Sequence, residues 1–278
     1  MAAEMADNTG RPPLDGAVVT ARAVRPGGLW REVQVTERTG STNDDCAVRA
    51  RAGAPEGIVL AAEEQNAGRG RLGRAWLSPP RAALTFSVLL RPACVPSAQR
   101  GWLPLLAGVA AVRAVRRVCG LDATLKWPND LLVGPGKLAG ILAEQSGDAV
   151  IVGIGVNVSA TRPELPVTGP AALPATSLLL EGSASLDRDL LLAEILGEIE
   201  RWYLIWRGTD LPGDPQDSGL RAEYLSLCAT IGRAVRADLP AGQTVDGTAT
   251  GLGAGGSLIV RTAGGEVTVG AGDVRHLR

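Results

Sequence analysis

Two predominantly apolar runs without a charged residue constrain the fold of this chain more than any other feature. Residues 57–62 read GIVLAA and residues 83–90 read ALTFSVLL. Apolar runs of this length without polar alternation are typical of strands that are buried on both faces. Further strands are predicted at residues 30–38, 124–127, 138–145 and 149–158. We therefore expect a central sheet with helices packed against it.

Three helices are predicted between and after these strands. The first runs from Ser41 to Gly53, and its Thr42 and Asp45 are spaced as in a capping box. The second covers residues 104–118, with a proline at its first position and its valines mainly on one side. The third covers residues 187–206, where apolar residues recur with helical spacing.

The last fifty residues differ in character from the rest of the chain. They contain short segments rich in Val, Thr and Gly at residues 233–237, 243–251, 257–262 and 266–270. Short strands at such spacing indicate a small β-barrel or sandwich. A length of 278 residues fits one large and one small domain. We predict a catalytic domain over residues 1–220 and a small domain over residues 221–278.

The sequence predicts neither a signal peptide nor a membrane-spanning helix. The N-terminal sequence MAAEMADNTGRPP lacks the basic start and apolar core of a signal peptide. The apolar run from Trp102 to Val112 is shorter than a membrane-spanning helix. We therefore expect a cytoplasmic protein without a membrane segment, and a loose lead-in with one short helix over residues 1–28.

The basic residues are distributed unevenly. Residues 65–121 contain nine arginines and neither Asp nor Glu, so this stretch must face an anion or lie solvated. Only two of the 28 basic residues are lysines, Lys126 and Lys137. A Lys ammonium is a compact point charge and an Arg guanidinium is a wide planar fork, so a site fitted to one does not accept the other. Both lysines are therefore candidate functional residues.

The loop Gly68-Arg69-Gly70-Arg71-Leu72-Gly73-Arg74-Ala75-Trp76 contains the letters of a dinucleotide fingerprint in the wrong context. Such a fingerprint opens a helix and is followed about 20 residues later by an acidic residue. Here Pro79 and Pro80 follow, and the next acidic residue is Asp122. The loop instead joins three guanidinium groups by glycines, which suits closure over a polyanion. A solvated turn is the alternative.

The segment Lys126-Trp127-Pro128-Asn129-Asp130 places an amide and a carboxylate after a predicted strand. Pro128 restricts Trp127 to an extended backbone, so the strand is expected to end there. Lys126 and Asp130 either form a simple ion pair or act together on a nucleotide. In the second case Asp130 holds Mg²⁺ on phosphate oxygens and Lys126 offsets their charge.

Two further segments combine small residues with one polar side chain each. Residues 136–140 read GKLAG, which is not a Walker A loop but starts a strand at Lys137 with room for a ligand. Residues 153–157 read GIGVN, and glycines within an apolar strand often mark a close approach by a ligand or another backbone. Asn157 ends that strand as a donor and acceptor.

Histidine and cysteine chemistry is not expected here. The single histidine, His276, is the third residue from the end and is expected at the surface. The four cysteines are scattered without a C-x-x-C pair, which favours buried thiols over a zinc site or disulfides. Lys, Arg, Asp and a metal ion must then carry the chemistry, which is the usual set for phosphate electrostatics.

Taken in order, these motifs resemble those of the biotin protein ligases. The resemblance covers residues 35–160 in detail, starting from a Ser-Thr-Asn turn at 41–43, and the small second domain is similar to the SH3-like barrel of that family. It implies a mixed β-sheet catalytic domain with flanking helices, related in fold to class II aminoacyl-tRNA synthetases. It also implies activation of biotin with ATP and Mg²⁺ to biotinyl-AMP. Biotin is then transferred to a lysine of a biotin carboxyl carrier protein.

The resemblance implies a role for each matching residue. Ser41, Thr42 and Gln65 hydrogen-bond the ureido ring of biotin, and Lys137 lies between the biotin carboxylate and the α-phosphate. The implied biotin-binding residues are Ser41, Thr42, Asn43, Gln65, Gly68, Arg69, Gly70, Arg71, Lys137, Gly140 and Gly153. The implied ATP-binding residues are Arg71, Arg74, Trp76, Lys126, Asn129, Asp130, Lys137 and Asn157. Lys137 and Arg71 are the catalytic candidates, and Asp130 is the candidate Mg²⁺ ligand.

Two other functions remain as alternatives from the sequence. A lipoate or octanoate ligase would share the fold and Lys137, yet would lack the arginine loop and the Lys126–Asp130 motif. A nucleic-acid-binding module could use residues 65–121, but a net charge of −1 and few aromatic residues argue against it. The chain has no room for the winged helix of the bifunctional family members, so no specific DNA binding is expected, and the oligomeric state stays open.

Overall fold

The apolar runs form the centre of a seven-stranded sheet in the computed structural model, which describes residues 10–167, 173–239, 242–270 and 272–277. The strand order is β1-β2-β3-β7-β6-β5-β4. Strands β1 and β2 are parallel, and the other neighbours are antiparallel, so the sheet is mixed as expected. The strands are β1 Glu32–Thr39, β2 Ile58–Gln65, β3 Ala83–Leu90, β4 Ala123–Lys126, β5 Asp130–Val133, β6 Gly136–Ser146 and β7 Ala149–Asn157. Strand β5 was not expected from the sequence.

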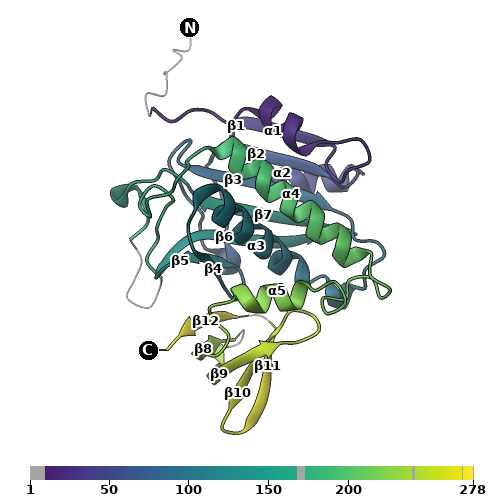
Figure 1. The fold of residues 1–278 in the computed structure, drawn as a ribbon, viewed down its shortest axis with the longest axis vertical. Coiled ribbons are helices and arrows are strands. Elements are labelled where there is room, and N and C mark those ends of the chain that lie inside the picture. The colour runs from purple at the N-terminus through teal and green to yellow at the C-terminus, as the bar shows by residue number, and fades with distance from the viewer. Residues whose placement is uncertain (1–9, 168–172, 240–241, 271, 278) are drawn as a thin grey trace.

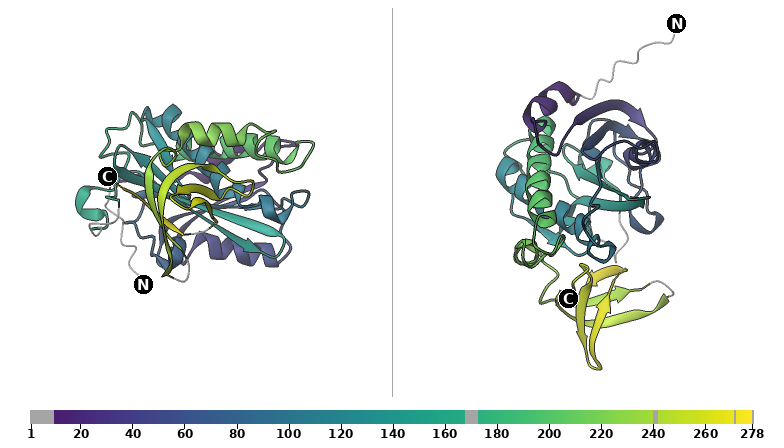
Figure 2. Two further views of the ribbon diagram at one scale, coloured as in Figure 1. Left: turned by 90° about the horizontal axis from the view of Figure 1, so that it is seen from below. Right: turned by 90° about the vertical axis from the view of Figure 1, so that its right-hand side faces the viewer.

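Helices cover both faces of this sheet (Figure 1 and Figure 2). Helices α1 (Gly16–Ala23), α3 (Trp102–Ala114) and α4 (Arg188–Arg207) pack over one face, where the large hydrophobic core lies. Helix α2 (Thr42–Arg51) packs over the opposite face and encloses a smaller apolar cluster. This double coverage explains why β3 is buried along its whole length. Residues 1–9 of the expected lead-in lie outside the described residues.

The start of α2 differs in one detail from the expected capping box. Ser41 is the N-cap, and its side chain accepts a hydrogen bond from the backbone N–H of Asp44. Thr42 is the first helical residue, so its hydroxyl is not used for capping. Its side chain points to Gln65 and Ser87 instead, which places it in the wall of the cavity described below.

The C-terminal segments form a separate five-stranded antiparallel sheet, in the order β11-β10-β9-β8-β12. Its strands are β8 Ala234–Asp238, β9 Thr244–Leu252, β10 Leu258–Thr262, β11 Gly265–Val269 and β12 Asp273–His276. Helix α5 (Leu220–Leu227) precedes it and contacts α3 and β4 of the large sheet. The domain boundary after residue 220 stays a prediction. Figure 2 shows the C-terminal sheet against one end of the large domain.

Two buried tryptophans tie the two sheets together. Trp102 Nε1 donates a hydrogen bond to the carbonyl oxygen of Ala254 at 2.6 Å, and Trp127 Nε1 donates to that of Gly256 at 2.9 Å. A Cβ atom on Gly101 would lie 2.4 Å from the carbonyl oxygen of Gly255, so only glycine permits this approach. The C-terminal sheet is therefore held close enough to contribute to a site in the large domain.

Two expectations from the sequence can be compared with the structure: that the cysteines are buried and that no helix spans a membrane. Cys46, Cys119 and Cys228 are buried free thiols, but Cys94 is exposed, so the expectation of burial was wrong for that residue. Within the described part of the chain, no helix combines the length and the apolar character that crossing a membrane requires.

Candidate functional site

The floor of the main cavity is a row of small side chains that crosses four strands. On the face of the sheet that α2 covers, Thr85 of β3 pairs with Gly155 of β7, and Gly155 pairs with Gly140 of β6. The same row continues to Asp130 of β5. Directly paired residues of neighbouring strands point to the same face. The glycines therefore open a space beside α2, and Asp130 stands at its far end.

The α2 end of the cavity is neutral and polar. The side-chain oxygen of Gln65 accepts hydrogen bonds from the Thr42 backbone N–H at 2.8 Å and from the Thr42 hydroxyl at 3.0 Å. The Thr42 hydroxyl also lies 2.7 Å from the hydroxyl of Ser87, which is fully buried. This end presents hydroxyl and amide groups to a ligand and carries no charge of its own.

Asn43 supports this wall from behind. Its Nδ2 donates to a Glu144 carboxylate oxygen at 2.6 Å, and its Oδ1 accepts from the Ser87 hydroxyl at 2.6 Å. A Cβ atom on Gly153 would lie 2.2 Å from Asn43 Oδ1. Gly153 is therefore required for the position of Asn43, and it need not contact a ligand to matter.

The arginine loop covers the cavity and is held by carboxylates. Arg69 forms two hydrogen bonds with the carboxylate of Asp44, at 2.7 and 2.5 Å, and these bonds lower the pKa of Asp44. Residues 71–73 form a short 3₁₀ turn in which Leu72 has a φ of 58°, the left-handed region. The loop does not open an α-helix, which agrees with the rejection of a dinucleotide fingerprint.

Trp76 lies directly on the glycine floor. A Cβ atom on Gly155 would come within 2.4 Å of the Trp76 ring, and one on Gly140 would lie 3.4 Å from it. The indole N–H of Trp76 is buried and has no hydrogen-bond partner among the described residues. An aromatic face over a glycine floor with a free donor is suited to binding a planar heterocycle.

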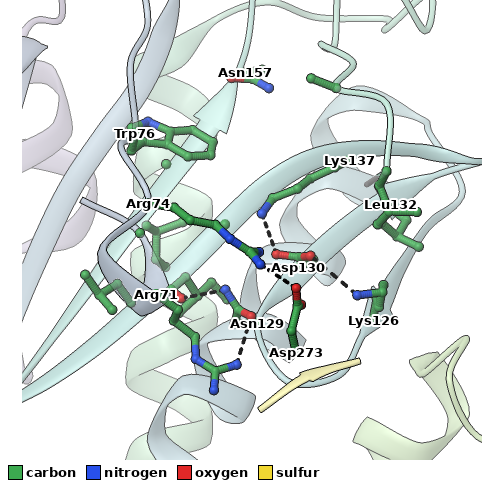
Figure 3. A pocket seen from close by; sticks show the side chains of 18 of the residues that line it. Arg71, Arg74, Trp76, Lys126, Asn129, Asp130, Leu132, Lys137, Asn157 and Asp273 are labelled. Atoms are coloured by element: carbon green, nitrogen blue, oxygen red, sulfur yellow. Dashed lines mark hydrogen bonds and ion pairs between the residues drawn. The ribbon is translucent and has the colours of Figure 1, made fainter. Parts of the chain in front are cut away.

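The opposite end of the cavity is cationic and surrounds Asp130 (Figure 3). Lys137 Nζ lies 2.6 Å from Asp130 Oδ1, and Lys126 Nζ lies 3.9 Å from Asp130 Oδ2. Burial lowers the pKa of Lys126, against the opposing effect of the charge of Asp130. The pair of lysines singled out by composition thus meets at one carboxylate, with two ammonium groups for a single negative charge.

Two arginines of the loop reach the same end. Arg71 donates to the side-chain oxygen of Asn129 at 3.3 Å, and burial lowers its pKa. Arg74 forms an ion pair with Asp273 of β12. Burial raises the pKa of Asp273, but the hydrogen bond and the charge of Arg74 outweigh it, so that the pKa is lowered overall. The loop is therefore linked to the C-terminal sheet.

The C-terminal sheet supplies one wall of the cavity, including His276. The expectation that His276 lies at the surface was wrong: it is partly buried, and Nε2 lies 3.0 Å from the Thr230 hydroxyl. Burial, followed by the charges of Lys126 and Arg233, lowers its pKa to about 4. His276 is therefore neutral at physiological pH and adds no charge to the cavity.

Asn157 lines the cavity at the end of β7. Its Nδ2 donates to the carbonyl oxygen of Thr176 at 2.8 Å, which leaves its side-chain oxygen toward the cavity as an acceptor. Figure 3 shows Asn157 beyond Trp76 and Lys137, on the side away from Arg71.

A cavity of about 1250 Å³ brings the predicted site residues together. This volume exceeds the range of about 300–1,000 Å³ for a site that holds one small molecule, so two substrates can be held side by side. Of the predicted residues only Gly68 lies outside the lining, at the base of the loop, where its carbonyl oxygen accepts a hydrogen bond from the backbone N–H of Trp76. The structure does not test the ligand role assigned to each residue.

The sequence prediction missed four groups at this site: Ser87, Glu144, Asp273 and His276. Ser87 had a detectable signal, because Thr85 and Ser87 are the only polar residues of an apolar strand and, two positions apart, must share a face. The other three had none. Glu144 and Asp273 look like ordinary surface carboxylates until the fold places them beside Asn43 and Arg74.

The fold and this cavity define a protein ligase of the biotin and lipoate class. Residues 35–159 match the model of the biotin/lipoate A/B protein ligase family, and residues 230–277 match that of the biotin protein ligase C-terminal domain. The biotin–[acetyl-CoA-carboxylase] ligase of Mycobacterium tuberculosis is 42% identical over 96% of this chain and 97% of its own length. That of Paracoccus denitrificans is 33% identical over 85% of this chain and 97% of its own length. The chain therefore belongs to the biotin protein ligase family.

Solved structures agree with this assignment. The biotin protein ligase from Aquifex aeolicus in complex with biotin and ATP superposes with a TM-score of 0.72 at 26% identity, over 89% of this chain and 100% of that one. The biotin protein ligase from Leishmania major in complex with biotinyl-5-AMP gives a TM-score of 0.59 at 26% identity, over 88% and 98% of the two chains. The predicted fold class and family are confirmed.

Proposed function

We propose that this enzyme activates biotin with ATP to biotinyl-5′-AMP and transfers the biotinyl group to a lysine of a biotin carboxyl carrier protein. One observation carries the proposal: a single cavity joins a neutral hydrogen-bonding end at Thr42 and Gln65 to a cationic end at Lys126 and Lys137. A neutral cyclic urea with an acid-bearing chain fits the first end, and a polyphosphate fits the second.

The polar end is assigned to the ureido ring. A ureido group has two N–H donors that flank one carbonyl acceptor, so its pocket must supply both acceptors and donors. Thr42 and Gln65 supply side-chain oxygens, and Ser41 and the loop residues Arg69 and Gly70 line the same cavity. The valerate chain then runs along the glycine floor past Gly153 and Gly140 toward Lys137.

Lys137 is assigned to the reacting atoms. In the first step the biotin carboxylate oxygen attacks the α-phosphorus of ATP, the bond to the bridging oxygen breaks, and pyrophosphate leaves. Negative charge accumulates on the α-phosphate oxygens, and an ammonium placed there stabilises the transition state. Asp130 Oδ1 lies 2.6 Å from Lys137 Nζ, which keeps the ammonium in place in the cavity.

The nucleotide is assigned to the cationic end and the Trp76 floor. In this proposal Arg71, Arg74 and Lys126 contact phosphate oxygens, and Trp76, Asn129 and Asn157 contact the nucleoside; all six residues line the cavity. Mg²⁺ is usually held through substrate phosphates and one or two carboxylates. Asp130 fits that pattern as a single carboxylate beside the phosphate end, and no group of three potential metal ligands occurs among the described residues. A bound Mg²⁺ would neutralise part of the phosphate charge.

The second step requires the carrier protein. The neutral amine of the carrier lysine attacks the carbonyl carbon of the mixed anhydride, an amide forms, AMP leaves, and the amine proton passes to water. The relatives from Mycobacterium tuberculosis and Paracoccus denitrificans are named as ligases for acetyl-CoA carboxylase. We propose the same class of carrier for this chain, in the cytoplasm, without sequence-specific DNA binding.

Isothermal titration with biotin, then with ATP, tests substrate identity and binding order together. Adenylate formation measured with biotin, lipoate and octanoate separates the two ligase activities. Pyrophosphate release with biotin and ATP, and its absence with lipoate, supports the proposal. Adenylation of lipoate at a rate equal to that of biotin would overturn it.

A further inference from the structure

Asp273 is a carboxylate among the cations that we assign to phosphate. It belongs to β12 of the C-terminal sheet and lines the cavity. Its ion-pair partner is Arg74 of the arginine loop, and the charges of Lys126 and Arg71 also lower its pKa. A carboxylate repels phosphate. Asp273 therefore opposes the binding of the anion that its neighbours attract.

The position of Asp273 relates it to the leaving group of the first step. In Figure 3, Asp130 lies between Lys137 and Asp273. Lys137 is assigned to the α-phosphate, and biotin approaches it from the α2 side. The attacking and leaving oxygens of a phosphoryl transfer lie roughly in line. The pyrophosphate group then extends away from biotin, toward Arg74 and Asp273.

The ion pair between Arg74 and Asp273 is exposed enough to open for a ligand. The side chains are 63% and 33% exposed, respectively. An exposed ion pair changes an equilibrium constant by about fivefold at most. Arg74 forms no other ion pair among the described residues, and only its Nη2 contacts the carboxylate. Arg74 can therefore change partners at little cost.

Arg74 cannot hold both anions without a penalty. A phosphate oxygen on its guanidinium would lie close to the Asp273 carboxylate, and like charges at short range repel strongly in a partly buried site. Asp130 is in a different position, because two ammonium groups, those of Lys126 and Lys137, face its single charge. Competition between a carboxylate and the leaving phosphates is thus confined to Arg74.

We propose that Asp273 competes with pyrophosphate for Arg74, so that re-formation of their ion pair promotes release of pyrophosphate while the adenylate stays bound. The proposal rests on the proposed function. Asp273 is a positioning residue, because it acts through Arg74 and contacts no reacting atom. Lys137 keeps its charge for the phosphate of the adenylate, which has to wait for the carrier protein. The exchange at Arg74 therefore separates the two products of the first step.

Asp273→Asn tests this competition, since it removes the charge and almost preserves the shape. The enzyme is loaded with biotinyl-AMP in a single turnover, freed of pyrophosphate, and mixed with inorganic pyrophosphate and Mg²⁺. The dependence of ATP formation on pyrophosphate concentration gives the apparent Kd of pyrophosphate. We expect the variant to bind pyrophosphate about three- to tenfold more tightly than the parent, with the KM for biotin unchanged.

The sign of the effect separates competition from a structural role. If Asp273 only held Arg74 or the loop in place, its loss would weaken pyrophosphate. In an Arg74→Gln background, Asp273→Asn should leave the Kd of pyrophosphate unchanged, because the proposed effect needs Arg74. Asp238→Asn is the matched control: Asp238 pairs with Asp273 on the neighbouring strand β8, but its ion-pair partner is Arg275. We expect this control to change the Kd less than about twofold.

The outcomes distinguish this proposal from the proposed function. If the parent releases no pyrophosphate from biotin and ATP, the proposed function is wrong. If the parent forms the adenylate but Asp273→Asn binds pyrophosphate equally or more weakly, the competition is wrong. An equal gain in Asp238→Asn, or in the Arg74→Gln background, would assign the effect to overall charge and also overturn the proposal. Thermal unfolding checks each variant, and Asp273→Ser decides the question if Asp273→Asn does not fold.

Discussion

Replacement of Lys137 by arginine separates the need for charge from the need for a compact charge. The ammonium lies between the Asp130 carboxylate, at 2.6 Å, and the glycine floor, where a Cβ on Gly140 would lie 3.6 Å from Lys137 Nζ and 3.4 Å from the Trp76 ring. A guanidinium is wider and planar, so it cannot occupy this gap without displacing Trp76 or the strand. We expect Lys137→Arg to fail almost as severely as Lys137→Ala.

The magnitude follows from the role assigned to Lys137. Removal of one preorganised donor from a developing oxyanion lowers the rate about 10²–10³-fold, which corresponds to about 2.7–4 kcal/mol. We expect losses in this range for both variants in the first-order rate of biotinyl-AMP formation. The side chain is about one-third exposed, so neither substitution should prevent folding.

Rapid quench with saturating biotin and ATP measures adenylate formation in a single turnover. Circular dichroism melting curves of both variants provide the control for folding. A rate for Lys137→Arg within tenfold of the parent would show that charge alone suffices, and the argument from the two lysines would then be refuted.

Four other outcomes follow from the same geometry. Protease should cut the loop over residues 68–76 in the free enzyme and spare it with biotin plus ATP, because that loop is held mainly by exposed ion pairs; equal cleavage in both states contradicts this. The Arg71→Gly variant should still form biotinyl-AMP but release it faster, because the substitution removes a guanidinium and adds flexibility to the loop. Bystander proteins should then be biotinylated. Tight retention of the adenylate by the variant would show that Arg71 does not hold the loop closed. Gly155→Ala should raise the KM for ATP at least about tenfold, since its Cβ would lie within 2.4 Å of the Trp76 ring; an unchanged KM removes Trp76 from the nucleotide site. His276 takes up a proton near pH 6.5 in the unfolded chain and only near pH 4 in the folded protein, so the free energy of unfolding should fall as the pH drops between these values. In urea unfolding, His276→Gln should show a fall that is smaller by about 1–2 kcal/mol than that of the parent. A pH dependence identical in the two proteins would exclude His276 as its source.

The sequence predicted the large sheet well because its strands carry local signals. The apolar runs at residues 57–62 and 83–90 and the glycine-bearing strand predicted at 149–158 were each identified from their own residues, and they correspond to β2, β3 and β7. Strand β5 was missed because only four residues form it and the first is Asp130, a residue type disfavoured in strands. Its place is fixed by antiparallel pairing with its sequence neighbours β4 and β6, a pairing that the composition of these four residues does not indicate.

The parts of the site that come from one contiguous motif were predictable from the sequence. The parts that the fold brings together from distant residues were not. The loop at residues 68–76 and the segment at 126–130 each form one part of the cavity wall. Glu144 and Asp273 reach the site through contacts of 101 and 199 residues in sequence separation. Contacts of that kind follow from strand register and domain docking, so they required the structure.

The acid-free stretch over residues 65–121 illustrates what a charge pattern can and cannot establish. The sequence left two readings, an anionic partner or solvation, but seven of its nine arginines form ion pairs with carboxylates from elsewhere in the chain. Arg100 donates to backbone carbonyl oxygens. Arg71 differs from these residues: it is half-buried, it lines the cavity, and among the described residues it forms no ion pair within 4 Å. Asn129 is its hydrogen-bond partner and the charges of Asp130 and Asp273 act on it, so its position favours the proposed anionic ligand in the cavity over an extended polyanion such as DNA.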